Sequence, residues 1–144
     1  MARHLILLCL ALQLNGAPAT VRLELSDEHR RGLRDDDNDL QLFVTGIEFQ
    51  ERPAGAYAVY VGLPAGSRDF DPESDHFVGS VSFFGAHPGE PYDEQFSVKD
   101  AIGAALAREA QLAAIEVTFV PYAPSSADAA SILIRGVRLE SEVA

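Results

Sequence analysis

Short runs in which apolar residues recur at every second position, separated by turns rich in glycine and proline, constrain this chain more than any other feature. In the first run, residues 20–25, Val21, Leu23 and Leu25 alternate with Arg22 and Glu24. A period of two places the apolar side chains on one face of a β-strand. Similar runs occupy residues 40–49, 57–63, 77–84, 94–96, 114–120 and 131–140. The sequence therefore predicts a mainly β domain.

Two of these runs change phase at a glycine. The apolar positions slip by one residue across Gly46 in the run 40–49 and across Gly136 in the run 131–140. An extra residue in a strand needs relaxed backbone angles, which glycine provides. We therefore expect two bent, bulged strands.

The segments between the runs are polar or contain helix-breaking and strand-breaking residues. Residues 26–39 are highly charged and contain Gly32, and residues 85–92 hold two glycines and two prolines. Both are predicted to be surface connections.

One segment has a helical pattern. Ser97 with Asp100 three residues later has the spacing of a capping box. The apolar residues of the following turns would share one face; they are Val98, Ile102, Ala105 and Leu106. About seven strands with one short α-helix, in a chain of single-domain length, predict an all-β fold: an antiparallel β-sandwich of jelly-roll-like type.

The first nineteen residues resemble a secretory signal. Arg3 precedes an apolar run over residues 5–14, and Ala17-Pro18-Ala19 fits a cleavage site. The run is too short to span a bilayer. Residues 1–19 are thus predicted to be a signal peptide or, alternatively, the remnant of an upstream segment, with the sandwich domain at 20–144. A functional signal implies a secreted or periplasmic protein; otherwise the protein is expected in the cytoplasm.

Charge and residue types exclude several functions. The formal net charge is −11, which opposes binding to a phosphate backbone, so neither nucleic acid nor a membrane is an expected partner. The four histidines lack metal-site spacing, and Cys9, the only cysteine, lies in the removable segment. A calcium-loop pattern that starts at Asp35 fails, because Leu40 and Gly46 occupy the required glycine and glutamate positions. We therefore predict no catalytic, cofactor-binding or metal-binding residues.

Five stretches, read in order, resemble the C-terminal domain of the tyrosinase and polyphenol oxidase family. They are TGIEF at 45–49, YAVYV at 57–61, the strand that begins FVGS at 77 and runs to Phe84, IEVTFVP at 115–121 and IRGVRLE at 134–140. The helical segment 97–106 lies where the family has its helix. The resemblance covers residues 40–140.

This resemblance implies a sandwich that packs over the entrance of a tyrosinase-type copper oxidase domain and shields its active site, assists its folding, or does both. The copper domain, to which the family domain is normally fused, is absent from this chain. The expected partner is therefore such an oxidase domain, either in trans or from a longer parent chain.

In such enzymes a side chain of the shielding domain can plug the substrate pocket, and an aromatic ring fits a phenol-shaped space. The candidates are Tyr92, Phe84, Phe70 and Tyr122, with Tyr92 first because it lies in a predicted exposed loop. Alternatively, Phe84 belongs to the core and the others cover loops.

A different class of function is also compatible with these residues. The chain could be a free secreted binding module for a carbohydrate or another small ligand. Tyr60, on the face opposite to Val59 and Val61, would then supply an exposed stacking platform.

Overall fold

The computed structural model describes residues 2–34, 38–53, 55–64, 66–68, 70–83, 85–122 and 131–143, and for residues 2–11, 34, 38 and 141–143 only the backbone. Eight strands and two helices occur in these ranges, in the order β1 Ala2–Leu14, β2 Ala19–Glu24, α1 Asp27–Arg34, β3 Asn38–Phe49, β4 Tyr57–Val61, β5 Phe77–Val81, β6 Tyr92–Ser97, α2 Lys99–Arg108, β7 Ala114–Pro121 and β8 Ile132–Val143.

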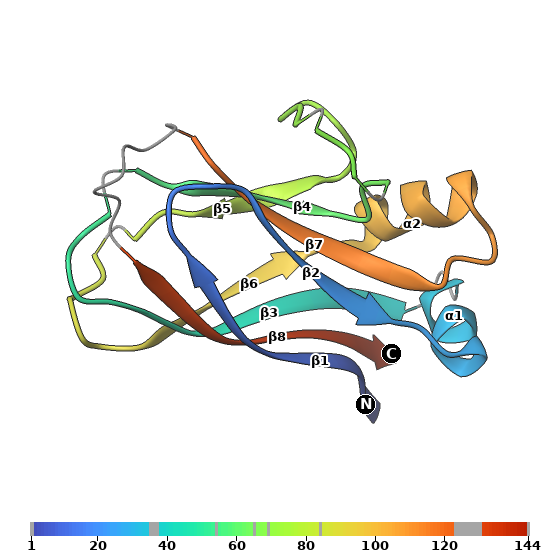
Figure 1. Ribbon diagram of the computed structural model, residues 1–144. Helices are drawn as coiled ribbons and strands as arrows, with labels where there is room; N and C mark the ends of the chain where they lie inside the picture. Colours follow the sequence, from blue (N-terminus) through green and yellow to red (C-terminus); the bar gives the residue numbers. More distant parts are fainter. Residues whose placement is uncertain are drawn as a thin grey trace.

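The strands form two four-stranded antiparallel sheets, in the orders β1-β8-β3-β6 and β2-β7-β4-β5 (Figure 1). The first strand pairs with the last, the second with the seventh, the third with the sixth and the fourth with the fifth. Successive pairs alternate between the sheets, as if one long hairpin had been rolled up. This is the topology of a jelly roll, and it confirms the predicted fold class.

The core lies between the sheets. β3 contributes Leu42, Val44 and Ile47, and the facing sheet contributes Val59 and Val117, all at most 1% exposed. Alternate residues of the same strands point outwards, as the period of two predicts.

The two phase slips lie side by side in the first sheet. Gly46 has a φ of +63°, and the pairing of β3 with β6 shifts between Val44 and Ile47, which confirms the predicted bulge. In the pairing of β3 with β8, however, Thr45 is opposite Gly136 and the register continues without a shift. The inward positions of β8 do change phase between Ile134 and Val137, level with Gly46. The bulge predicted at Gly136 is not found in the described backbone of β8, because the one shift in the pairing of β8 with β1 lies between Leu5 and Leu7.

Helix α2 covers one end of the sandwich, next to α1 (Figure 1). Ala101, Ile102 and Ala105 are buried, as the helical pattern predicts. The predicted cap at Ser97 is wrong: Val98 is the N-cap residue and no side chain caps the helix. The reason is that the N–H of Val98 still donates to the Leu40 carbonyl, so the strand pairing continues to the start of the helix.

The charged segment 26–39, predicted as a plain connection, contains α1. Ser26 caps this helix by accepting from the N–H of His29 at 3.1 Å, while its own N–H donates to His29 Nδ1 at 3.1 Å. This is a capping box with histidine in the place of glutamate or glutamine. Neither α1 nor α2 has the length and continuous apolar character that crossing a bilayer requires.

The structure begins the sandwich at residue 2, whereas the sequence placed its start at residue 20. The apolar run 5–14 lies within β1, which is hydrogen-bonded along β8. β5 is also shorter than expected, because it ends at Val81 and Phe83 adopts a positive φ of 60°.

Candidate functional site

Tyr122, directly after β7, is the most exposed of the described plug candidates, with 52% of its surface accessible. Its hydroxyl is hydrogen-bonded to that of Ser80 at 2.7 Å, and its N–H donates to the Ala56 carbonyl at 3.1 Å. The ring is therefore held in place while one face is open to a partner.

Phe70 packs on the outer face of the second sheet instead of projecting from it. The ring centroids of Phe70 and Tyr60 are 5.8 Å apart. The Phe77 ring packs edge-on against the Tyr60 ring, with 5.6 Å between the centroids. Tyr60 is only 2% exposed as a result. The stacking platform expected of a carbohydrate module is thus not at the surface.

The segment between β4 and β5 covers Tyr60 because it is anchored at both ends. His76 Nδ1 lies 2.9 Å from the Val61 carbonyl, and the Arg108 guanidinium donates to the Gly62 carbonyl at 3.1 Å. His76 is therefore engaged with the backbone. All five side chains of β4 are buried, since both faces of this strand are covered.

Tyr92, expected in an exposed loop, is instead the first residue of β6 and is half-buried. Its hydroxyl oxygen is enclosed. Burial raises the pKa of Tyr92 to about 12, with the Glu94 carboxylate adding to the effect and the backbone of Phe83 opposing it. Burial also raises the pKa of Glu94. The phenol of Tyr92 therefore lies on the inward face of β6, which is an edge strand of the first sheet.

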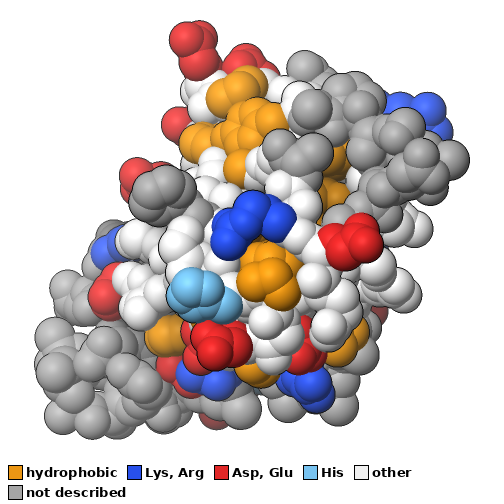
Figure 2. Space-filling view, turned by 90° about the vertical axis from the view of Figure 1, so that its left-hand side faces the viewer, with side chains coloured by type: hydrophobic (Ala, Val, Ile, Leu, Met, Phe, Trp, Pro, Cys, Tyr) orange, Lys and Arg blue, Asp and Glu red, His pale blue; other side chains and the backbone are white. Residues whose placement is uncertain are grey.

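Phe84 lies outside the described residues, whereas contacts are described for Phe83 and Ala86 on either side of it. Phe83 is 3% exposed and packs edge-on against Phe49 and Tyr57. Arg52 donates to the carbonyls of Phe83 at 3.0 Å and Ala86 at 2.7 Å. Figure 2 looks onto this end of the sandwich, where basic, acidic, histidine and hydrophobic side chains are intermixed.

The candidates are not gathered into one site. Tyr122 and Phe70 belong to the outer face of the second sheet. Phe70 packs against the cluster that contains Ala58, and Ser80, the hydrogen-bond partner of Tyr122, pairs with Ala58. Tyr92 lies at the far edge of the first sheet. Only Tyr122 combines a fixed position with a largely accessible ring among the described candidates.

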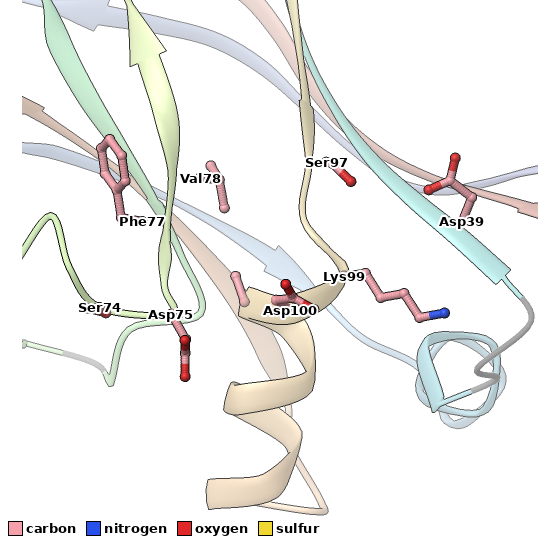
Figure 3. A pocket seen from close by; sticks show the side chains of 9 residues that line it. Asp39, Ser74, Asp75, Phe77, Val78, Ser97, Lys99 and Asp100 are labelled. Carbon is pink, nitrogen blue, oxygen red and sulfur yellow. The ribbon is translucent and has the colours of Figure 1, made fainter.

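A polar hollow of about 480 Å³ lies beside the start of α2 (Figure 3). Asp39 of β3, Asp75 of the turn before β5 and Asp100 of α2 line it, and Lys99 extends towards α1. No group of three potential metal ligands occurs among the described residues. The described lining of the hollow includes Ser74 and Ser97 but no histidine or cysteine.

No protein-family model and no curated protein matches the sequence. The fold is similar to that of latent apple tyrosinase, with a TM-score of 0.56 and 19% identity over 92% of this chain and 27% of that chain. It is also similar to a recombinant latent aurone synthase, a polyphenol oxidase, with a TM-score of 0.61 and 13% identity over 90% of this chain and 26% of that chain.

This chain therefore spans about a quarter of the polyphenol oxidase chains it matches. The resemblance inferred from the strand sequence is confirmed at the level of the fold. The protein is a jelly-roll domain with the fold of one part of the plant polyphenol oxidases, consistent with their C-terminal domain.

Proposed function

We propose that this chain is a non-catalytic accessory domain that packs on a tyrosinase-type dicopper oxidase domain, shields its active site and assists its folding. The observation that carries the proposal is the fold: at least 90% of the chain superposes on a minor part of latent polyphenol oxidases. A part that recurs in latent enzymes is suited to restrict access to a reactive centre.

The geometry of the domain supports a role in covering a site. The described residues include no group of three potential metal ligands. Two of the described histidines, His29 and His76, are engaged with backbone groups, whereas His87 is exposed. The surface instead offers a firmly held aromatic ring at the end of β7. Fixed aromatic side chains contribute strongly to protein interfaces because little conformational entropy is lost when they are buried.

Tyr122 is the plug candidate that the described contacts favour. Phe70 is already packed on Tyr60, and Tyr92 has its hydroxyl enclosed. The Ser80 hydroxyl holds the Tyr122 ring in a single orientation. In this proposal the ring enters the mouth of the oxidase pocket and occupies the space of a phenolic substrate.

Co-expression with a tyrosinase-type oxidase domain tests the proposal. Complex formation is measured by size-exclusion chromatography, and phenol oxidation is measured before and after this chain is removed. We expect a stable complex with suppressed oxidation that recovers on removal. The folding role predicts a higher yield of soluble copper-loaded oxidase in the presence of this chain. Unchanged activity together with no complex refutes the proposal.

The role of the plug residue is tested by Tyr122→Ala in the same complex. This variant should relieve most of the suppression, because it removes the ring, whereas Tyr122→Phe should retain it. Leu133→Ala is a matched control, since Leu133 is an exposed hydrophobic residue on the other sheet with 36% of its surface accessible. If all three variants suppress oxidation like the parent chain, Tyr122 is not the plug.

A further inference from the structure

The outer edge of β8 is covered along its length by β1. The two strands are antiparallel from Ala2 opposite Val143 to Leu14 opposite Ile132, with one irregularity between Leu5 and Leu7. β8 also pairs with β3 on its other side. β8 is therefore an interior strand of the sheet only because residues 2–14 are present.

The side chains of β8 that face the core are strongly apolar. The inward residues of β8 are at most 1% exposed; they are Ile132, Ile134, Val137 and Leu139. Leu14 of β1 is fully buried and Leu12 packs against the same core. A sheet edge that binds another strand requires apolar side chains at alternate positions, together with backbone N–H and C=O groups that can pair with the added strand.

The connection to β2 adds further contacts. The N–H of Gly16, at a φ of +91°, donates to the Tyr57 hydroxyl at 2.7 Å. The Gln13 amide donates to the Ser131 hydroxyl. β1 is thus linked both to the opposite sheet and to the start of its partner strand.

The segment with the pattern of a cleavable leader is therefore the first strand of the jelly roll. Removal of residues 1–19 would leave the backbone N–H and C=O groups of one edge of β8 without partners. It would also uncover the apolar residues beneath β1. Unpaired, flat and apolar sheet edges bind other strands.

We propose that the edge of β8 is a strand-acceptor site, that residues 2–14 of this chain are its occupant, and that the segment stays bound when its connection to β2 is cut. The ligand class is an extended apolar peptide. This proposal is independent of any oxidase partner.

The first test uses the full chain. A specific protease sequence is inserted after Gly16, and the folded protein is cut and analysed by size-exclusion chromatography and intact mass. We expect the N-terminal fragment to co-elute in equimolar amount and the melting temperature to be largely retained. Release of the fragment from the cut, folded protein overturns the proposal, whether or not the melting temperature falls.

The second test uses a chain that starts at Ala19. Loss of β1 should lower the melting temperature by about 15 °C or more, since the backbone pairing along β8 is lost together with the buried side chain of Leu14 and the core contact of Leu12. A synthetic peptide of residues 2–18, with a C-terminal lysine tag for solubility, should restore it. A stable dimer that this peptide cannot displace would show that a second copy is the occupant and would overturn the proposal.

A peptide with Leu8→Pro and Cys9→Pro is the matched control. Adjacent residues of an antiparallel strand direct their N–H groups to opposite sides, so one of the two prolines removes a donor towards β8. This peptide should fail to restore stability. Equal rescue by both peptides, or a shortened chain as stable as the parent, contradicts a strand-acceptor site. If the shortened chain does not fold, the cut full-length protein decides the question.

Discussion

Gly79 and Phe96 set how closely the edge strands β5 and β6 of the two sheets can approach. Gly79 has a φ of +149°, and a Cβ atom at this position would lie 2.8 Å from Cδ1 and 2.9 Å from Cε1 of the Phe96 ring. Phe96 is only 7% exposed, so its ring has little room to move. We predict that Gly79→Ala destabilises the domain.

The cost has two parts. A non-glycine residue in this backbone region costs about 1–3 kcal/mol, and forcing a methyl group into a packed interior costs about 1–3 kcal/mol. We therefore expect a loss of about 2–6 kcal/mol in the free energy of unfolding. For a chain of this size the melting temperature should fall by about 6–18 °C.

Gly103→Ala is the same chemical change with the opposite expected sign. Gly103 lies in the exposed part of α2, and a Cβ atom there would have no neighbour within 4 Å. Alanine is favoured over glycine in a helix by up to about 1 kcal/mol. The melting temperature of Gly103→Ala should therefore rise by about 2 °C.

Urea denaturation of both variants, and of Gly79→Ala in a Phe96→Leu background, measures these effects. The smaller leucine side chain should reduce the cost of Gly79→Ala by about 1 kcal/mol or more, because the steric part is relieved. A cost below about 0.5 kcal/mol for Gly79→Ala, or one that Phe96→Leu does not change, would refute the proposed packing of the two strands.

Further predictions concern five other residues. Tyr60→Ala should reduce the unfolding free energy by about 3–4 kcal/mol in urea melts, whereas Tyr122→Ala should cost less than about 1 kcal/mol; similar losses would mean that Tyr60 is not enclosed. Because burial raises the pKa of Glu94, its contribution to stability is complete below its ordinary pKa of 4.5 and is lost as the pH rises through the folded value. Glu94→Gln should therefore raise the melting temperature at neutral pH but not well below pH 4.5, and an equal effect at both would contradict this. For Tyr92, with a pKa of about 12 against an ordinary 10.0, the contribution is complete below pH 10.0 and lost towards pH 12; near-ultraviolet titration should show an ionisation near pH 12 that Tyr92→Phe lacks. Arg52→Ala removes two hydrogen bonds to backbone carbonyls and should speed limited proteolysis within residues 85–91, whereas proteolysis at the parent rate would show that Arg52 does not hold this turn.

Local patterns predicted most of the strands because each strand has one face in the core. The alternation in residues 20–25 and 114–120 appears in the structure as β2 and β7, with Val21, Leu23 and Val117 buried. The change of phase at Gly46 could be predicted for the same reason, because the residues that face the core after a bulge must again be apolar. The strand order that makes this a jelly roll required the structure.

Other features depended on distant contacts. The face of β4 that carries Tyr60 is buried because Phe70 packs over it. The alternation of residues within β4 itself cannot indicate a contact with a residue outside the strand. Tyr92 was assigned to a loop from its neighbouring prolines, but pairing with Ile47 makes it part of a strand. Helix α1 could have been found from the Ser26 and His29 pair, a capping signal in a segment whose charge favoured a loop.

The sequence by itself determined the class of fold, because the period of apolar residues fixes which side of each strand avoids water. The sequence also limited the possible catalytic and metal-binding chemistry, because a chain can use only the side chains it contains. The tertiary structure alone decided that the leader-like residues 2–14 form a strand against β8, since an apolar run is equally suited to a signal and to a sheet. It also decided which aromatic ring stays accessible, because exposure depends on segments that meet only when the chain is folded.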